Sequence, residues 1–63
     1  MNKIDKFKKS KHMSYEKIAK ESGVTAQYVF LLAKGKRTNP SLEVMKAISQ
    51  ALGERVEKVF QIN

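Results

Sequence analysis

Three glycines divide this chain into segments short enough to restrict it to small helices. Gly23, Gly35 and Gly53 each end a stretch in which apolar residues recur at helical spacing. Helices commonly end at glycine, because glycine adopts the left-handed backbone conformation at no steric cost. Nowhere do apolar and polar residues alternate for long enough to predict a strand. The spacing predicts an all-α fold of five short helices, forming a single domain over residues 1–63.

Capping residues mark where the predicted helices begin. Ser14 and Thr25 precede apolar-periodic segments, and their hydroxyls are suited to accept a hydrogen bond from a free N–H of the first turn. The fourth helix has two candidate starts: Ser41 caps it, or Asn39 caps it with Pro40 at the first helical position. The predicted helices cover about residues 3–11, 14–23, 25–35, 55–60 and, for the fourth, from 39 or 41 to 52.

The charge of the chain points to a polyanionic partner. Thirteen Lys and Arg oppose six Asp and Glu, which gives a net charge of +7 and a pI near 9.9. A small basic domain suits nucleic acid or an anionic membrane surface. The alternative is a solvated basic surface that only keeps the protein soluble. A membrane-surface peptide is the least favoured, because the apolar stripe of the fourth helix needs burial within a fold.

Several other classes of function are not expected from the composition. The chain has no cysteine and a single histidine, His12, so we expect no metal site and no cofactor. It has no Ser/His/Asp or Cys/His set and no phosphate-cradling glycine loop, so we expect neither an enzyme nor a small-molecule ligand. No stretch has the length of a signal peptide or a membrane span, which predicts cytoplasmic residence.

The second and third predicted helices are joined by only "SGVT", which forces them to cross steeply. From Tyr15 to Lys34 the chain reads "YEKIAKESGVTAQYVFLLAK". This stretch resembles the helix-turn-helix of the lambda-repressor-like family, the Cro/repressor or Xre-type regulators. The residues that carry the resemblance are Ile18, Ala19, Gly23, Val24, Val29 and Leu32.

The resemblance continues to the end of the chain. "GKRTNPSLEVMKAISQALG" is similar to the loop and fourth helix of that family, and "VEKVF" is similar to its fifth helix. It implies a compact five-helix DNA-binding domain that regulates transcription, of the kind found in phage- or mobile-element-type repressors. The alternative is an antitoxin-like or other protein-interaction module with the same fold.

The third predicted helix has an outward face that is mostly apolar. A helical wheel separates it from a core face that contains Val29 and Leu32. The resemblance implies that the outward face enters the major groove and reads bases. Gln27 suits adenine, and the apolar members suit thymine methyl groups, so A·T pairs would be favoured. The predicted base-reading residues are Ala26, Gln27, Phe30, Leu31 and Lys34.

Two of these residues have a second interpretation. Exposed apolar neighbours often mark a protein interface. For Phe30 we leave DNA contact and protein contact as equal alternatives, whereas for Leu31 we favour DNA.

The resemblance also implies a set of contacts to the DNA backbone, which fix register and supply affinity. Tyr15 stands where the family commonly has a phosphate-binding glutamine. Thr25 can either cap its helix or bind phosphate, and capping is favoured. The predicted phosphate-binding residues are Tyr15, Thr25, Tyr28, Lys36, Arg37, Thr38 and Asn39.

The chain departs from the family pattern at two places. A glutamate of the third helix often pairs with an arginine of the first helix, but Ala33 and Lys8 occupy these positions. The sequence therefore predicts that this ion pair is lost. The usual glycine at the end of the first helix is His12, for which we expect a left-handed backbone.

The C-terminal segment is the predicted site of assembly. Family members of this size commonly dimerise through C-terminal helices, and double-stranded DNA with a two-fold site is the expected partner. We therefore expect a homodimer, either stable in solution or completed only on DNA. The candidate dimer residues are Val59, Phe60 and Ile62, of which Val59 is equally suited to the core.

Overall fold

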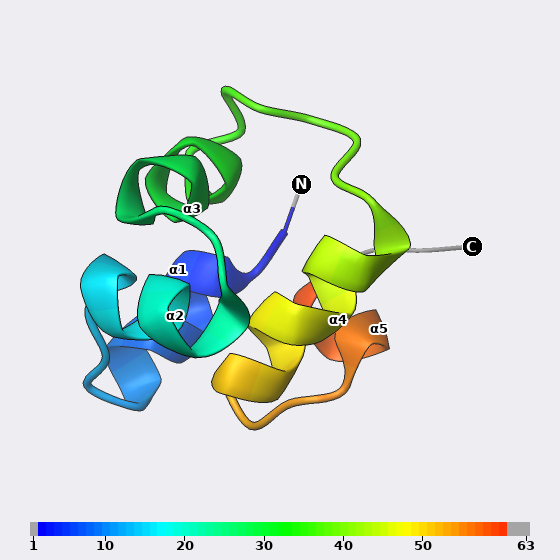
Figure 1. The fold of residues 1–63 in the computed structure, drawn as a ribbon. Helices are drawn as coiled ribbons and strands as arrows, with labels where there is room; N and C mark the ends of the chain where they lie inside the picture. Colours follow the sequence, from blue (N-terminus) through cyan, green and yellow to red (C-terminus); the bar gives the residue numbers. More distant parts are fainter. Residues whose placement is uncertain (1, 61–63) are drawn as a thin grey trace.

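The computed structural model describes residues 2–60, and within that range it contains five helices (Figure 1). They are α1 (Ile4–Ser10), α2 (Tyr15–Ser22), α3 (Ala26–Ala33), α4 (Leu42–Ala51) and α5 (Val56–Val59). The predicted all-α fold is confirmed. None of the helices in this range is both long and apolar enough to cross a membrane.

The helices pack as two groups that share α2. The helix α3 crosses α2, α4 packs against another side of α2, and the short α5 packs against α4 (Figure 1). A long connection across the top of the molecule joins α3 to α4. This arrangement leaves α3 at one edge of the molecule, supported from one side only.

Side-chain caps start three of the helices as predicted. The hydroxyls of Ser14, Thr25 and Ser41 accept hydrogen bonds from backbone N–H groups three residues later, at 3.1, 3.0 and 3.2 Å. Ser41 is therefore the cap of α4, and the alternative with Asn39 and Pro40 is wrong. Asn39 lies instead in the left-handed region, at φ 56°, which asparagine tolerates better than most residues.

The first helix ends as the sequence predicts. His12 has φ 55°, so it takes the left-handed conformation that the family gives to glycine. The backbone N–H of Met13 donates to the Lys8 carbonyl at 2.9 Å, which closes the end of α1. The turn then leads directly to the Ser14 cap, so α1 and α2 are joined by only a few residues.

Apolar side chains from all five helices meet in one core. Ile4, Ile18, Val29, Ile48 and Val59 each come from a different helix and are almost fully buried. Because α3 contributes Val29 and Leu32 to this core, its orientation about its own axis is fixed by their burial. The remaining side of α3 is therefore turned outward.

Val59 and Phe60 lie in this core, which confirms the core alternative for Val59 and corrects the prediction for Phe60. Val59 is 1% exposed and Phe60 is 5% exposed, so neither side chain is available to a second copy of the chain. The N-terminal segment covers them: the Lys3 N–H donates to the Val59 carbonyl at 2.7 Å, and Asn2 forms an antiparallel bridge with Phe60. Ile62, the third candidate dimer residue, lies outside the described residues.

We expect Phe60→Ala to lower the free energy of unfolding by about 3 kcal/mol or more, because it leaves a cavity in the core. The matched control is Leu42→Ala, since Leu42 is 50% exposed and its truncation should cost less than about 0.5 kcal/mol. Urea unfolding followed by circular dichroism measures both. A Phe60 variant that keeps wild-type stability but loses self-association would show instead that Phe60 lies in the dimer interface.

Candidate nucleic-acid interface

The outward side of α3 carries the residues that the sequence predicts to read bases. Gln27 is exposed, Phe30 is 40% exposed, and Leu31 is half-buried. Ala26 is also half-buried and packs partly against the core, so it contributes less surface than the helical wheel suggests. The side chains that remain open to a partner are therefore one amide and two large apolar groups.

Phe30 is not fully solvated, because a residue of α2 covers one side of its ring. Tyr15 meets Phe30 edge to face, with ring centroids 5.6 Å apart and an interplanar angle of 85°. Aromatic pairs favour this geometry. An intramolecular contact thus accounts for part of the apolar character of α3, and it joins the start of α2 to the middle of α3.

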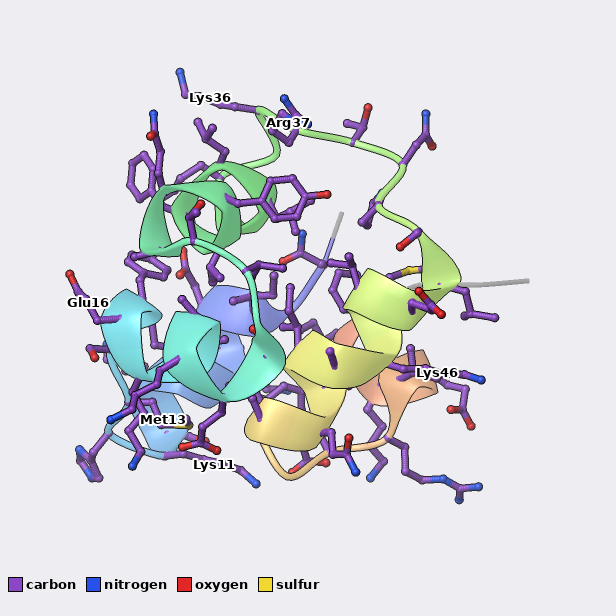
Figure 2. The ribbon with its side chains drawn as sticks, viewed as in Figure 1. Lys11, Met13, Glu16, Lys36, Arg37 and Lys46 are labelled. Carbon is purple, nitrogen blue, oxygen red and sulfur yellow. The ribbon has the colours of Figure 1, made fainter. Side chains whose placement is uncertain are left out.

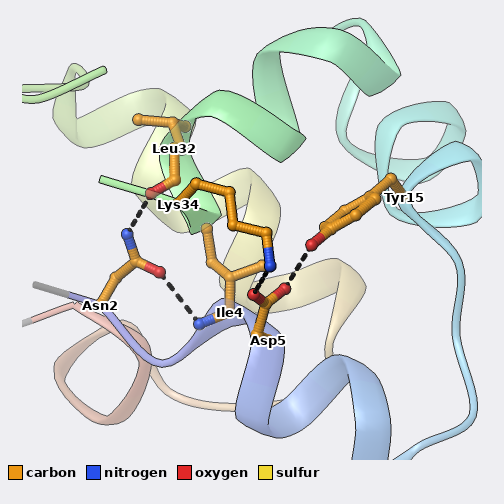
Figure 3. Close-up of polar contacts among 6 residues, drawn as sticks. All are labelled: Asn2, Ile4, Asp5, Tyr15, Leu32 and Lys34. Atoms are coloured by element: carbon orange, nitrogen blue, oxygen red, sulfur yellow. Dashed lines mark hydrogen bonds and ion pairs between the residues drawn. The ribbon is translucent and has the colours of Figure 1, made fainter. Parts of the chain in front are cut away.

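The Asp5 carboxylate on α1 binds two of the predicted DNA-contacting side chains (Figure 3). The Tyr15 hydroxyl donates to Asp5 Oδ1 at 2.5 Å, and the Lys34 Nζ donates to Asp5 Oδ2 at 3.0 Å. Lys34 therefore directs its ammonium group toward α1, although its place on the helical wheel predicts base reading. Tyr15 likewise directs its hydroxyl to a carboxylate of its own chain.

The family's ion pair between α1 and α3 is replaced by a different one. The positions named by the family pattern, Ala33 and Lys8, indeed form none. A pair between Asp5 and Lys34 connects the same two helices with the charges reversed. The available signal was Asp5 itself, which is the only acidic residue in the lysine-rich first helix.

The network changes the acidity of its three members. Burial alone would raise the pKa of Asp5. The hydrogen bond from Tyr15 and the interactions with Lys34 lower it by more than burial raises it, so the pKa of Asp5 lies below the ordinary value. Burial and the hydrogen bond to Asp5 raise the pKa of the Tyr15 phenol. The hydrogen bond to Asp5 also raises the pKa of Lys34. At neutral pH the network therefore contains a carboxylate, an ammonium group and a neutral phenol.

The N-terminal segment holds the C-terminal end of α3. The Asn2 amide donates to the Leu32 carbonyl at 2.7 Å, and its carbonyl accepts from the Ile4 N–H at 3.1 Å (Figure 3). One side chain thus adds a second hydrogen bond to the Leu32 carbonyl, which also accepts from the Gly35 N–H at 3.1 Å, and satisfies a free N–H at the start of α1. This contact was not predicted from the sequence, although asparagine beside a helix start is a known capping signal.

The connection after α3 places two basic side chains beside the helix. Gly35 has φ 74°, which turns the chain so that the N–H groups of Lys36 and Arg37 both donate to the Leu31 carbonyl, at 2.9 and 3.2 Å. The Arg37 guanidinium lies over the Tyr28 ring, 5.3 Å from its centroid. Arg37, which follows the C-terminal end of α3, thereby reaches back to Tyr28 in its first turn, so two predicted phosphate-binding residues lie together.

Lys36 and Arg37 are exposed, and neither takes part in an ion pair among residues 2–60. Figure 2 shows them at the edge of the molecule formed by α3 and its following connection, whereas Lys11 and Lys46 lie at other edges. Thr38 and Asn39 continue this exposed connection. The basic excess is therefore spread around the molecule, and Lys36 and Arg37 are the part of it that directly follows α3 and bonds to the Leu31 carbonyl through the backbone.

Thr25 acts as the cap of α3, as favoured by the sequence, through its hydroxyl oxygen and the Tyr28 N–H. Its hydroxyl hydrogen is not used by that bond, so the residue keeps one donor at the exposed start of the helix. Other basic residues are neutralised within the chain: Lys11 pairs with Glu54 at 3.1 Å, and Lys17 pairs with Glu21 at 3.4 Å.

The chain is similar in sequence to known helix-turn-helix proteins. A family model described as helix-turn-helix matches residues 4–59, which include all five helices. The chain is 33% identical over 54 residues to the HTH-type transcriptional regulator SlrR of Bacillus subtilis, a match that covers 86% of this chain and 36% of that protein. It is also 33% identical over 58 residues to an uncharacterized HTH-type transcriptional regulator of Archaeoglobus fulgidus, with 92% of this chain and 80% of that protein covered. The chain thus corresponds to only part of the Bacillus protein.

Proposed function

Because the chain belongs to the helix-turn-helix family of transcriptional regulators, we propose that it binds operator DNA sequence-specifically through α3 in the major groove. We further propose that it represses transcription, as a phage- or mobile-element-type repressor. One observation carries the proposal: α3 has an outward surface formed by Gln27, Phe30 and Leu31, which we call the reading surface. Two basic side chains, Lys36 and Arg37, directly follow it and form no ion pair among residues 2–60. Base contacts would provide specificity there, and phosphate contacts would provide affinity.

The chemistry of the reading surface determines what it would recognise. Gln27 is an exposed amide and suits the N6 and N7 edge of adenine. Phe30 and Leu31 offer only apolar contact, which in the major groove suits the C5 methyl group of thymine. A surface with one amide and two apolar side chains therefore favours A·T pairs over G·C pairs.

We expect Gln27→Ala to lose about 1–3 kcal/mol of binding free energy on the preferred site and little on random DNA, because it removes one bidentate base contact. The preferred site is first obtained by selecting bound sequences from a random pool. Fluorescence anisotropy at one salt concentration then compares both DNAs. An equal loss on the two would reassign Gln27 to the DNA backbone.

A second experiment tests the apolar contacts without changing the protein. Deoxyuridine lacks only the C5 methyl group of thymine, so its substitution at the contacted positions should weaken binding by roughly 1 kcal/mol. Deoxyuridine placed outside the selected site is the control. If no position in the site is sensitive, Phe30 and Leu31 do not contact thymine methyl groups, and the protein-contact alternative is favoured for both.

Lys36 and Arg37 are expected to bind phosphate. Substituting either by Ala should weaken all sequences alike and reduce the slope of log affinity against log salt by about one unit. Lys46→Ala is the matched control, since Lys46 lies on α4 at a different edge (Figure 2). If the affinity of the wild-type protein for DNA does not depend on salt, phosphate contacts do not supply it. That result would favour an antitoxin-like interaction module over a DNA-binding regulator.

We also propose that the protein acts on DNA as a two-fold homodimer. The backbone of one copy extends 28 Å along its longest axis and presents a single α3, whereas recognition helices on successive major-groove turns lie roughly 34 Å apart. One copy can therefore place its α3 in a single groove turn only. A second copy would double the number of bases read.

The homodimer predicts an inverted-repeat site with half-sites about one helical turn apart. Two copies should bind cooperatively to the full site, and a change of half-site spacing by about five base pairs should abolish cooperativity without affecting a single half-site. Native mass spectrometry of the complexes counts the copies. An asymmetric selected site that holds one copy would contradict the proposal.

A further inference from the structure

Tyr15 and Lys34 come from different helices but share one acceptor, the Asp5 carboxylate (Figure 3). The family resemblance assigns both side chains to DNA, as ligands of phosphate and of bases. In this structure neither is free to bind DNA without leaving Asp5 or sharing it. The two donors and the carboxylate also bring the start of α2, the end of α3 and the first turn of α1 together.

The surroundings of Asp5 resemble a phosphate-binding site in their donors. A carboxylate oxygen accepts charge-assisted hydrogen bonds from ammonium and hydroxyl groups, as a phosphate oxygen does. Lys8 adds a further positive charge, because its Nζ lies 4.7 Å from the centroid of the Tyr15 ring. The Lys34 Nζ lies 5.9 Å from the centroid of Phe30, so the network reaches the reading surface itself.

We propose that Asp5 is an intramolecular competitor of DNA phosphate, which holds Lys34 and Tyr15 in the free protein and releases them when DNA binds. This inference rests on the proposed function and adds a way in which the affinity for DNA is set. Asp5 lowers the affinity for all DNA sequences, because each binding event must first separate it from the two donors. We expect its effect to be similar on all sequences, because Asp5 holds Lys34 and Tyr15 but makes no hydrogen bond with Gln27, Phe30 or Leu31 of the reading surface.

The exchange of partners is feasible because the contact is open to solvent. The side chains of Lys34 and Asp5 are 44% and 42% exposed, and exposed ion pairs contribute little to stability. Phosphate binding additionally releases condensed counterions from the DNA, which no internal carboxylate provides. Lys34 therefore gains by moving to DNA, while the Asp5 carboxylate left behind repels the phosphate backbone.

The direct test is Asp5→Asn, which keeps the size of the side chain and removes its charge. At about 0.1 M salt we expect the affinity for the selected site and for random DNA to rise by the same factor, roughly 3–10-fold, and the salt slope to rise by about one unit. Asp5→Glu, which retains the charge and both acceptors, should restore affinity to near the wild-type value.

The matched control is Glu57→Gln, which removes one exposed carboxylate that also has a basic partner. Glu57 lies on α5 and pairs with Arg55 at 3.8 Å, so this variant has the same net charge as Asp5→Asn. We expect its affinity to change less than about 2-fold, because the charge is remote from α3. An equal gain in the two variants would reduce the role of Asp5 to net charge and overturn the proposal.

A background substitution separates competition from simple repulsion. In Lys34→Gln protein the main donor is absent, so the added Asp5→Asn change should no longer raise the salt slope. A full rise in that background would overturn the proposal, because it would show that Asp5 acts on phosphate directly.

A measurement without DNA verifies the contact and the fold of each variant. The phenol of Tyr15 should titrate at a lower pH in Asp5→Asn than in the wild-type protein, because the substitution removes the carboxylate that raises its pKa. NMR resolves it from Tyr28. An unchanged Tyr15 titration, or an Asp5→Asn variant that loses affinity, would overturn the proposal. If the wild-type protein binds no DNA at any salt, the proposed function fails as well, whereas binding with no gain in Asp5→Asn removes only this inference.

Discussion

The steep crossing of α2 and α3 is the constraint on which the rest of this molecule depends. Ile18 of α2 and Val29 of α3 are fully buried, and the short connection through Gly23, at φ 79°, turns the chain from α2 into α3. Because Val29 and Leu32 must face inward, the orientation of α3 is decided by the core. The identity of the outward residues then follows from the helical period alone.

Local features were readily predicted from the sequence. The caps at Ser14 and Thr25 and the left-handed turn at His12 depend on neighbouring residues only, so the chemistry of a few adjacent positions specifies them. The first residue of α4 could not be predicted from the sequence, because Ser41 and Asn39 are both suitable caps. The structure selected Ser41, whose hydroxyl reaches the Val44 N–H.

The contacts that the sequence could not predict join residues far apart in the chain. Asp5 and Lys34 are separated by 29 positions, and Asn2 and Leu32 by 30. No periodicity links such pairs. The prediction that Phe60 lies in a dimer interface was wrong for a related reason. An apolar side chain suits both a core and an interface, and only the fold determines which of the two it enters. Phe60 is buried because the N-terminal segment runs beside it.

That N-terminal segment has a consequence for how the protein is handled. Asn2 bonds the end of α3 and pairs with Phe60, while the Lys3 backbone bonds Val59. The first residues of the chain therefore brace the helix proposed to read DNA against the last helix of the fold. A purification tag or a fluorophore attached ahead of Asn2 would lie beside these contacts and disturb them. Labels for binding assays are therefore better placed elsewhere, for example at a cysteine introduced on the exposed face of α4.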